Sequence, residues 1–375
     1  MEILPLIVSF FLAALVTAVL TPVAGKLATL LRVIDRPSER KVSDRQGIPL
    51  LGGLAVVAGC AIGLFAYVLM AGESDLAKVR DHLAAFMAGG MLLVMVGAWD
   101  DRFDLGAWQK IPFQFLAAAI AINAGFVIDY FTNPLTLVTH MLPQWLSWLF
   151  TLGWIVVVTN AMNLIDGLDG LTTGIGAIIA GTLAIICFQA DQLSGLLIAM
   201  AMLGALLGFL PFNFPPARIF LGDAGALFIG FALALISIQG YKKATLLTFI
   251  VPLLALAVPL LDTVLSVIRR VRAGKRIFSA DKRHMHHLLL AREGSERKAV
   301  LWLYFQTLCF GIIAISFVDL RGYSAYIFLI AVVILTLRLL KNLDVLGIEK
   351  IESAPREPRN NTERSAEDQS EEGFK

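Results

Sequence analysis

Long apolar runs, separated by short polar connections, recur along almost the whole chain. A helix needs about 20 mainly apolar residues to cross the hydrocarbon core of a bilayer, and runs of this kind predict about eleven spanning helices here. Neither the alternation of a transmembrane β-barrel nor the period of a soluble repeat is present in the sequence. The predicted fold is therefore an all-α integral membrane protein. Its predicted spans are residues 4–27, 49–71, 82–99, 112–129, 145–160, 168–190, 193–213, 222–239, 244–268, 299–317 and 322–340.

Composition agrees with a lipid environment. Of the 375 residues, 58% are hydrophobic and 16% are charged, and the mean hydropathy is +0.77, which is beyond an ordinary soluble domain. The first apolar run lacks a preceding basic segment and a small-residue cleavage site, which favours a retained helix over a signal peptide. Cys60, Cys187 and Cys309 lie far apart inside apolar runs, as is typical of small buried side chains rather than disulfides or zinc ligands.

Lysine and arginine are distributed unevenly between the connections, and cytoplasmic connections carry the excess of these residues. The first connection and the one after the ninth predicted span are strongly basic, whereas residues 129–145 contain no Lys or Arg. With an odd number of spans, this pattern predicts an outside N-terminus and a cytoplasmic C-terminus. Lys242 and Lys243 break the rule on the outer side, but the two basic connections outweigh this short one.

The chain divides into two regions by composition. Residues 1–345 are expected to form one multi-pass domain in the inner (plasma) membrane, with its polar chemistry on the cytoplasmic face. Residues 350–375 are rich in Glu, Ser, Arg, Asn and Pro and cannot bury enough apolar surface to fold, which predicts a disordered cytoplasmic tail.

Six aspartates gather at the predicted cytoplasmic ends of the apolar runs. An ionised side chain at the bilayer centre costs about 2.5–3.5 kcal/mol, so these acids must lie at the water interface, be paired, or bind a metal. For a single acid, a solvated helix cap remains an equally good explanation. The six are Asp100, Asp101, Asp166, Asp169, Asp223 and Asp262.

The adjacent Asp100 and Asp101 indicate a cation, because two close like charges repel each other unless a positive charge neutralises them. Acid and amide oxygens without a nearby cysteine suit Mg²⁺ or Mn²⁺. Since Mg²⁺ is usually held by one or two carboxylates together with substrate phosphates, the cluster also predicts a phosphorylated substrate.

The segment NAMNLIDGLDGL places a polar residue at every third position, and two glycines follow its acids. Gly167 and Gly170 predict a bend or break that would let these amides and acids converge on one ligand. A polar contact between helices is the alternative explanation. The polar residues are Asn160, Asn163, Asp166 and Asp169.

The segment SADKRHMHHLLL contains three clustered histidines, His284, His286 and His287, next to Lys282 and Arg283. Two of the histidines share a helical face and could bind zinc, but no cysteine is near and the basic neighbours would repel a metal. Binding of a diphosphate by imidazole and ammonium donors explains the segment better. A basic loop that only touches anionic lipid is the alternative, and it leaves the histidines unexplained.

In combination, these motifs resemble the polyprenyl-phosphate N-acetylhexosamine-1-phosphate transferases of glycosyltransferase family 4, of the WecA and TagO type, which are related to MraY. The form Asp281-x-x-His284-x-His286-His287 is similar to the WecA and TagO branch. One departure concerns residues 42–44, which read Val, Ser and Asp where the family commonly has a His. The resemblance extends through Asp35-Arg36-Pro37, Arg40-Lys41, residues 49–53, residues 97–101, Lys110, Gln114, residues 160–171, 220–225, 259–262 and 281–287.

The resemblance implies transfer of an N-acetylhexosamine 1-phosphate, usually GlcNAc 1-phosphate, from a UDP-sugar to undecaprenyl phosphate, with release of UMP and with Mg²⁺ or Mn²⁺ as cofactor. It would start the synthesis of a cell-surface glycan. The family suggests a homodimer in the lipid bilayer, and no nucleic-acid partner is expected. The candidate catalytic residues are Asp100, Asp101, Asp166, His284 and His287; the candidate substrate-binding residues are Lys110, Asn163, Asp169, Arg270, His286, Arg40 and Lys41; and the candidate metal ligands are Asp223, Asp101 and Asp166.

Two other classes of protein are consistent with intramembrane acids. An ion-coupled transporter usually places them at the midplane, in broken helices of two matching halves, whereas here they lie at the cytoplasmic ends and no internal repeat is visible. In a membrane scaffold the polar clusters would be incidental. The sequence leaves the sugar open among GlcNAc, GalNAc and deoxy variants.

Overall fold

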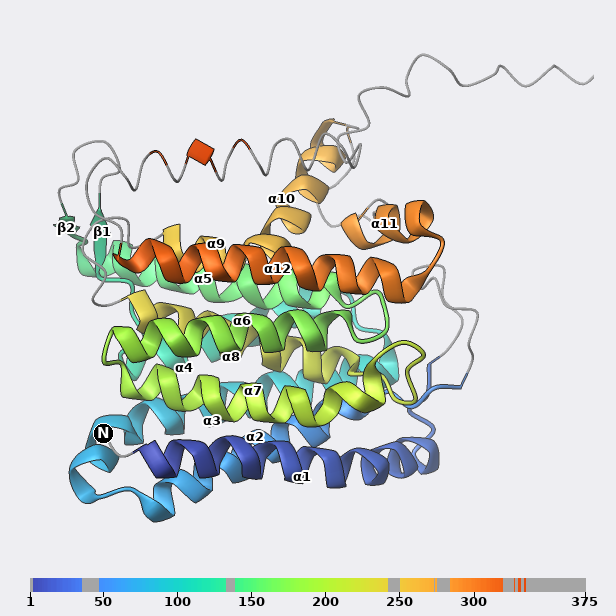
Figure 1. Ribbon diagram of the computed structural model, residues 1–375, viewed down its shortest axis with the longest axis horizontal. Coiled ribbons are helices and arrows are strands. Elements are labelled where there is room, and N and C mark those ends of the chain that lie inside the picture. The colour runs from blue at the N-terminus through green and yellow to red at the C-terminus, as the bar shows by residue number, and fades with distance from the viewer. Residues whose placement is uncertain are drawn as a thin grey trace, which may run out of the picture.

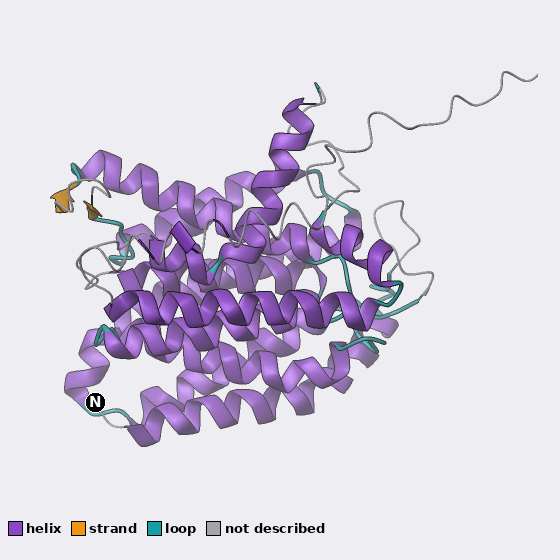
Figure 2. Cartoon of the chain, turned by 45° about the horizontal axis from the view of Figure 1, so that its top comes forward, coloured by secondary structure: helices purple, strands orange, loops and turns teal. Residues whose placement is uncertain are grey.

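The computed structural model describes residues 3–35, 47–132, 139–241, 250–272 and 284–319, with the single residues 274, 327, 330, 331 and 334. Within these residues the chain is almost entirely helical (Figure 2). The helices are α1 (Ile3–Leu30), α2 (Gly52–Met70), α3 (Glu73–Phe103), α4 (Ala107–Asn123), α5 (Gln144–Ile165), α6 (Leu171–Gln189), α7 (Leu193–Asn213), α8 (Gly222–Tyr241), α9 (Ile250–Ala255), α10 (Ala257–Arg272), α11 (Met285–Glu293) and α12 (Glu296–Asp319). A small antiparallel hairpin joins β1 (Tyr130–Thr132) to β2 (Thr139–Met141).

The long helices lie side by side in one bundle (Figure 1). Eight of the helices in the described residues, α1, α2, α3, α5, α6, α7, α8 and α12, are long and apolar enough to cross a membrane. Helix α8 is at the centre, since it contacts α2, α3, α5, α6 and α7 and 94% of its apolar window is buried. The prediction of an all-α integral membrane protein is confirmed.

The predicted spans and the observed helices agree closely for the first eight spans and the tenth. The third and fourth differ most, because α3 begins nine residues before residue 82, and α4 begins five residues before residue 112 and ends six before residue 129. The ninth is only partly described and consists of two helices, α9 and α10. Pro259 has no N–H to donate to the preceding turn, which interrupts the hydrogen-bond ladder where α10 begins. The eleventh lies almost wholly outside the described residues, so the count of eleven stays a prediction.

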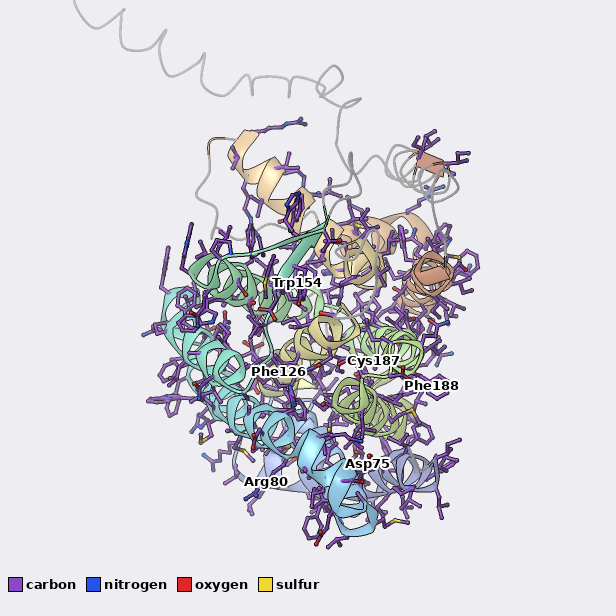
Figure 3. All side chains as sticks on the ribbon, turned by 90° about the vertical axis from the view of Figure 1, so that its left-hand side faces the viewer. Asp75, Arg80, Phe126, Trp154, Cys187 and Phe188 are labelled. Carbon is purple, nitrogen blue, oxygen red and sulfur yellow. The ribbon has the colours of Figure 1, made fainter. Side chains whose placement is uncertain are left out.

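Side chains tie the helices together inside the bundle. Figure 3 views the bundle end on and labels Trp154 of α5, whose Nε1 donates to the Ser237 hydroxyl of α8 at 2.9 Å. Cys187, also labelled, is fully buried. All three cysteines are free, which confirms the prediction that they form no disulfide framework.

Close packing fixes the first turn of α8. A Cβ atom on Gly53 of α2 would collide with the backbone of Gly225, and one on Gly97 of α3 would collide with the backbone of Ala224. Only glycine allows these approaches of backbone to backbone. As a result, the close contacts with α2 and α3 hold Asp223, the second residue of α8, at the end of α3.

The two ends of the bundle differ in character. The hairpin lies at one end, and α11 lies at the opposite end, where α1 finishes and α12 begins (Figure 1). Helix α10 leaves the bundle and carries basic residues in its last turn. The predicted tail and most of the basic residues of the first connection, at positions 36–45, lie outside the described residues.

Candidate active site

Two neighbouring aspartates, Asp100 and Asp101, lie in the last turn of α3. The helix stops at Asp104, which has left-handed backbone angles (φ 53°). Successive residues on a helix point about 100° apart, so Asp100 and Asp101 face different partners. The Asp101 carboxylate accepts the backbone N–H of Asp223 through Oδ1 (2.8 Å) and that of Ala224 through Oδ2 (3.3 Å). These N–H groups have no partner within α8, so Asp101 caps that helix.

Lys110, in the first turn of α4, bridges the other aspartate of α3 to α8. Its Nζ donates to the Asp100 carboxylate and to Asp223 Oδ2, the latter at 2.8 Å. Asp100 also accepts the N–H of Leu105 at 2.6 Å. Burial by itself would lower the pKa of Lys110, but the two carboxylates outweigh it and raise the pKa above its ordinary value. Lys110 is therefore an ammonium ion at neutral pH.

The cluster suits a divalent cation held partly by substrate. Two carboxylates, of Asp100 and Asp223, share one ammonium, and the Asp223 side chain remains 33% exposed. The third carboxylate, of Asp101, binds the backbone N–H of Asp223. The Asn163 amide of α5 approaches the Asp223 carboxylate, and its Nδ2 is buried without a hydrogen-bond partner of good geometry among the described residues. No three His, Cys, Asp or Glu side chains of the described part converge on a metal position. These groups suit Mg²⁺ only if oxygen atoms of the substrate phosphates complete the coordination of the ion.

The turn of residues 166–170 joins α5 to α6 and carries two further candidates. Asp166 ends α5 and is partly exposed. Asp169 is buried, and its Oδ2 accepts the N–H of Ala217 at 2.8 Å, while its own N–H donates to Glu296 Oε1 at 2.9 Å. Asp169 thus connects this turn to the loop between α7 and α8, and its predicted contact with substrate stays a prediction.

The histidines are arranged by a buried aspartate of α10. Asp262 Oδ2 lies 2.9 Å from His284 Nδ1, and Asp262 Oδ1 accepts the N–H of Met285 at 2.7 Å. The His286 ring presses against the backbone of Gly167, where an added Cβ would collide with its Nε2. Burial lowers the pKa of His286 to about 3 despite the nearby Asp262 carboxylate. This histidine is therefore neutral and would meet a phosphate as a hydrogen-bond donor, without a charge.

The other sequence-predicted residues are placed as follows. His287 is partly exposed, with its ring centroid 4.2 Å from that of His286. Arg270 is largely buried near the end of α10. Arg40 and Lys41 lie outside the described residues, as do Lys282 and Arg283.

At this end of the bundle one predicted residue has a different partner than expected, and three residues of α12 take part that the sequence does not single out. Asn160 exchanges two hydrogen bonds with Gln114, at 2.6 and 3.3 Å, and so ties α4 to α5 rather than facing the turn. Glu296, Arg297 and Tyr304 of α12 bind backbone atoms of two site loops. Their sequence positions give no periodic or motif signal, since their partners are main-chain atoms about 80 to 130 residues away.

The chain is similar to a family of known proteins. Residues 83–241 match the model of glycosyl transferase family 4. The chain is 33% identical to a probable undecaprenyl-phosphate N-acetylglucosaminyl 1-phosphate transferase of Bacillus subtilis, over 92% of this chain and 94% of that protein. It is 36% identical to a decaprenyl-phosphate N-acetylglucosaminephosphotransferase of Mycolicibacterium smegmatis (86% and 84% covered). It is 32% identical to an undecaprenyl-phosphate alpha-N-acetylglucosaminyl 1-phosphate transferase of Yersinia pestis (74% of each).

Proposed function

Because the chain belongs to glycosyl transferase family 4, we propose that it transfers N-acetylglucosamine 1-phosphate from a UDP-sugar to a polyprenyl phosphate and releases UMP. The observation that carries this proposal is the arrangement at one end of the bundle, where the carboxylates of Asp100 and Asp223 share the Lys110 ammonium. Undecaprenyl phosphate is the acceptor that we propose, as in the names of the Bacillus and Yersinia relatives.

We propose Mg²⁺, or Mn²⁺ in its place, as the cofactor, with Asp223 and Asp166 as its protein ligands. Bound there, the ion would neutralise part of the diphosphate charge, which two approaching polyanions require. Asp101 supports the same site in a different way. Both of its oxygens accept N–H groups of α8, so it orients Asp223 from behind.

The chain's own residues supply the remaining chemistry. A phosphate monoester is mostly dianionic at neutral pH, so Asp100 need only accept a last proton from the lipid phosphate. Oxygen of that phosphate then attacks the β-phosphorus of the UDP-sugar in line. A bond from this oxygen to the β-phosphorus forms, and the bond from the β-phosphorus to the bridging oxygen breaks, which leaves UMP with the electron pair.

We assign the surrounding polar residues to the two phosphate-bearing substrates. We assign Lys110 to the lipid phosphate, beside Asp100. The residues assigned to the donor diphosphate and nucleotide are Asn163, Asp169, Arg270, His284, His286, His287, Arg40 and Lys41.

The placement in the membrane is also a proposal. We infer that the end with α11 faces the cytoplasm, that the N-terminus lies outside and that residues 1–345 form one transferase domain in the plasma membrane. The basic residues in the last turn of α10 and in the first connection support this orientation. From the family likeness we also propose a homodimer, which light scattering of the detergent complex would test.

The experiment that tests the function is a transfer assay. Detergent-purified protein is mixed with radiolabelled UDP-GlcNAc, undecaprenyl phosphate and Mg²⁺, and labelled lipid and UMP are counted. Product that disappears with EDTA and with Asp100→Asn supports the reaction and its metal, and UDP-GalNAc in a parallel reaction tests the sugar. Folded protein that forms no labelled lipid from either donor would refute the proposal and favour tests of ion-coupled transport.

A further inference from the structure

The start of α12 holds two loops of the site through their backbones. Glu296 Oε1 accepts the N–H of Asp169 at 2.9 Å, and Arg297 Nε donates to the carbonyl of Pro215 at 2.8 Å. Two turns further along, the Tyr304 hydroxyl donates to the carbonyl of Gly170. We call Glu296, Arg297 and Tyr304 the α12 brace. All three side chains bind main-chain atoms, so the brace fixes the path of the chain.

The two loops that the brace holds are also bonded to each other. They are the turn of residues 166–170 and the loop of residues 214–221, which leads directly into Asp223. Asp169 Oδ2 of the turn accepts the N–H of Ala217 in the loop at 2.8 Å. The Asn213 amide, at the end of α7, donates to the carbonyl of Ile219 at 3.0 Å. A shift of either loop would therefore move the other.

The turn also contacts the histidines, which lie on the element just before α12. His286 of α11 packs against Gly167, and only residues 294 and 295 separate α11 from α12. The same stretch of chain thus carries the histidines and holds the turn that they face. Tyr304 has little freedom in this role, because its ring fills the space that a Cβ on Gly174 of α6 would occupy.

We propose that the α12 brace positions the donor side of the active site, by fixing the distance between the histidines and the turn of residues 166–170. Its members are positioning residues that do not touch substrate. This inference rests on the proposed function, in which the donor diphosphate lies between these two groups. Asp100 and Lys110, which we assign to the lipid phosphate, are on α3 and α4 and have no hydrogen bond to the brace.

The assignment predicts an asymmetric kinetic defect. Losing one hydrogen bond from a loop changes an equilibrium by about three- to tenfold. Glu296→Ala and Tyr304→Phe should therefore raise the KM for UDP-GlcNAc by about three- to tenfold and leave the KM for undecaprenyl phosphate unchanged. Glu296→Gln keeps an acceptor oxygen at the same place and should restore the wild-type KM. Lys298→Ala, at an exposed position of the same turn, is the matched control and should behave as wild type.

The measurements are initial rates at varied donor and varied lipid, with the dissociation constant of UDP-GlcNAc from calorimetry and the melting midpoint of each variant. Folded Glu296→Ala and Tyr304→Phe proteins with wild-type donor KM would overturn the inference. So would a fall in kcat at unchanged donor KM, or equal changes in the KM of both substrates. If the wild type binds UDP-GlcNAc but forms no product, the proposed function fails, while a raised dissociation constant in Glu296→Ala would still support the brace.

Discussion

Asp101 offers the sharpest test of how the site is built. Its two oxygens accept the first N–H groups of α8, from Asp223 at 2.8 Å and from Ala224 at 3.3 Å. If Asp101 acts only through this cap, Asp101→Ala should lower stability and shift Asp223. The effect on chemistry should then be indirect and should depend on metal concentration. A residue that itself removed a proton or bound the metal would show a different pattern.

The size of the effect follows from the two bonds. Replacing an N-terminal cap by Ala costs about 0.5–2 kcal/mol, and the loss of a carboxylate at a helix N-terminus adds about 0.3–1 kcal/mol. For Asp101→Ala we expect about 2 kcal/mol, which corresponds to a melting midpoint lower by about 2.5 °C in a chain of this size. Asp101→Asn keeps one acceptor for the shorter bond, so we expect a loss of about 1 kcal/mol of stability and a melting midpoint lower by about 1 °C.

The assay combines thermal unfolding in detergent with transfer rates over a range of Mg²⁺ concentrations. Both variants should need more Mg²⁺ for half-maximal rate, and Asp101→Asn should keep part of the wild-type maximum. Asp104→Asn is the control, because Asp104 is exposed three residues further on and asparagine tolerates its left-handed backbone. An Asp101→Asn protein with an unchanged melting midpoint and no activity at any Mg²⁺ concentration would refute the proposal that Asp101 acts only by capping α8.

Three further predictions concern the rest of the site. Lys110→Gln removes the cation that the buried Asp100 and the partly exposed Asp223 carboxylates share, which should cost about 3 kcal/mol of stability and abolish transfer. Because the pKa of Lys110 is raised, its contribution to stability should be constant at neutral pH and lost only above about pH 10.5, as denaturation of wild type and variant will show. His286, whose pKa burial lowers to about 3, must stay neutral in the folded protein, so stability should fall as the pH drops below about 6.5, and His286→Gln should show a smaller fall. Gly167→Ala places a Cβ against His286 and should reduce transfer at least tenfold, whereas Gly153→Ala, which meets open space, should not; equal rates in the two variants would contradict the packing.

The sequence predicts the spans well because lipid imposes a strict requirement on each helix by itself. Helices α1 to α3 and α5 to α8 fall where the apolar runs are. The ninth span shows the limit of this reasoning. Hydropathy does not register the missing N–H of Pro259, so it predicts one span where the structure has two helices, α9 and α10.

For the candidate site, the sequence predicts the chemical groups better than their partners. Charge repulsion between Asp100 and Asp101 leads to the prediction of a divalent cation, which stays a prediction. The structure adds the Lys110 ammonium, which bonds Asp100 and which this reasoning does not identify. The spacing of the polar residues before the turn does not reveal that Asn160 faces Gln114 instead. Such contacts depend on which helices become neighbours, and a single sequence does not encode this in any local pattern. For the same reason the sequence does not identify Glu296, whose partner is a backbone N–H of a turn far away in the chain.

The carboxylates at this end of the bundle have two different roles, and these roles can be distinguished only by the contacts that each carboxylate makes. Asp101, Asp169 and Asp262 each accept a backbone N–H from a segment far along the chain. Each thereby fastens one part of the site: the start of α8, the loop before it and the start of α11. Charge-assisted bonds of this kind offset the cost of burying an ion. Because an amide oxygen can still accept an N–H, substitution by Asn should be tolerated better at these three positions than at Asp100 or Asp223, whose carboxylates share a lysine. The number of acids therefore overstates the number that can react.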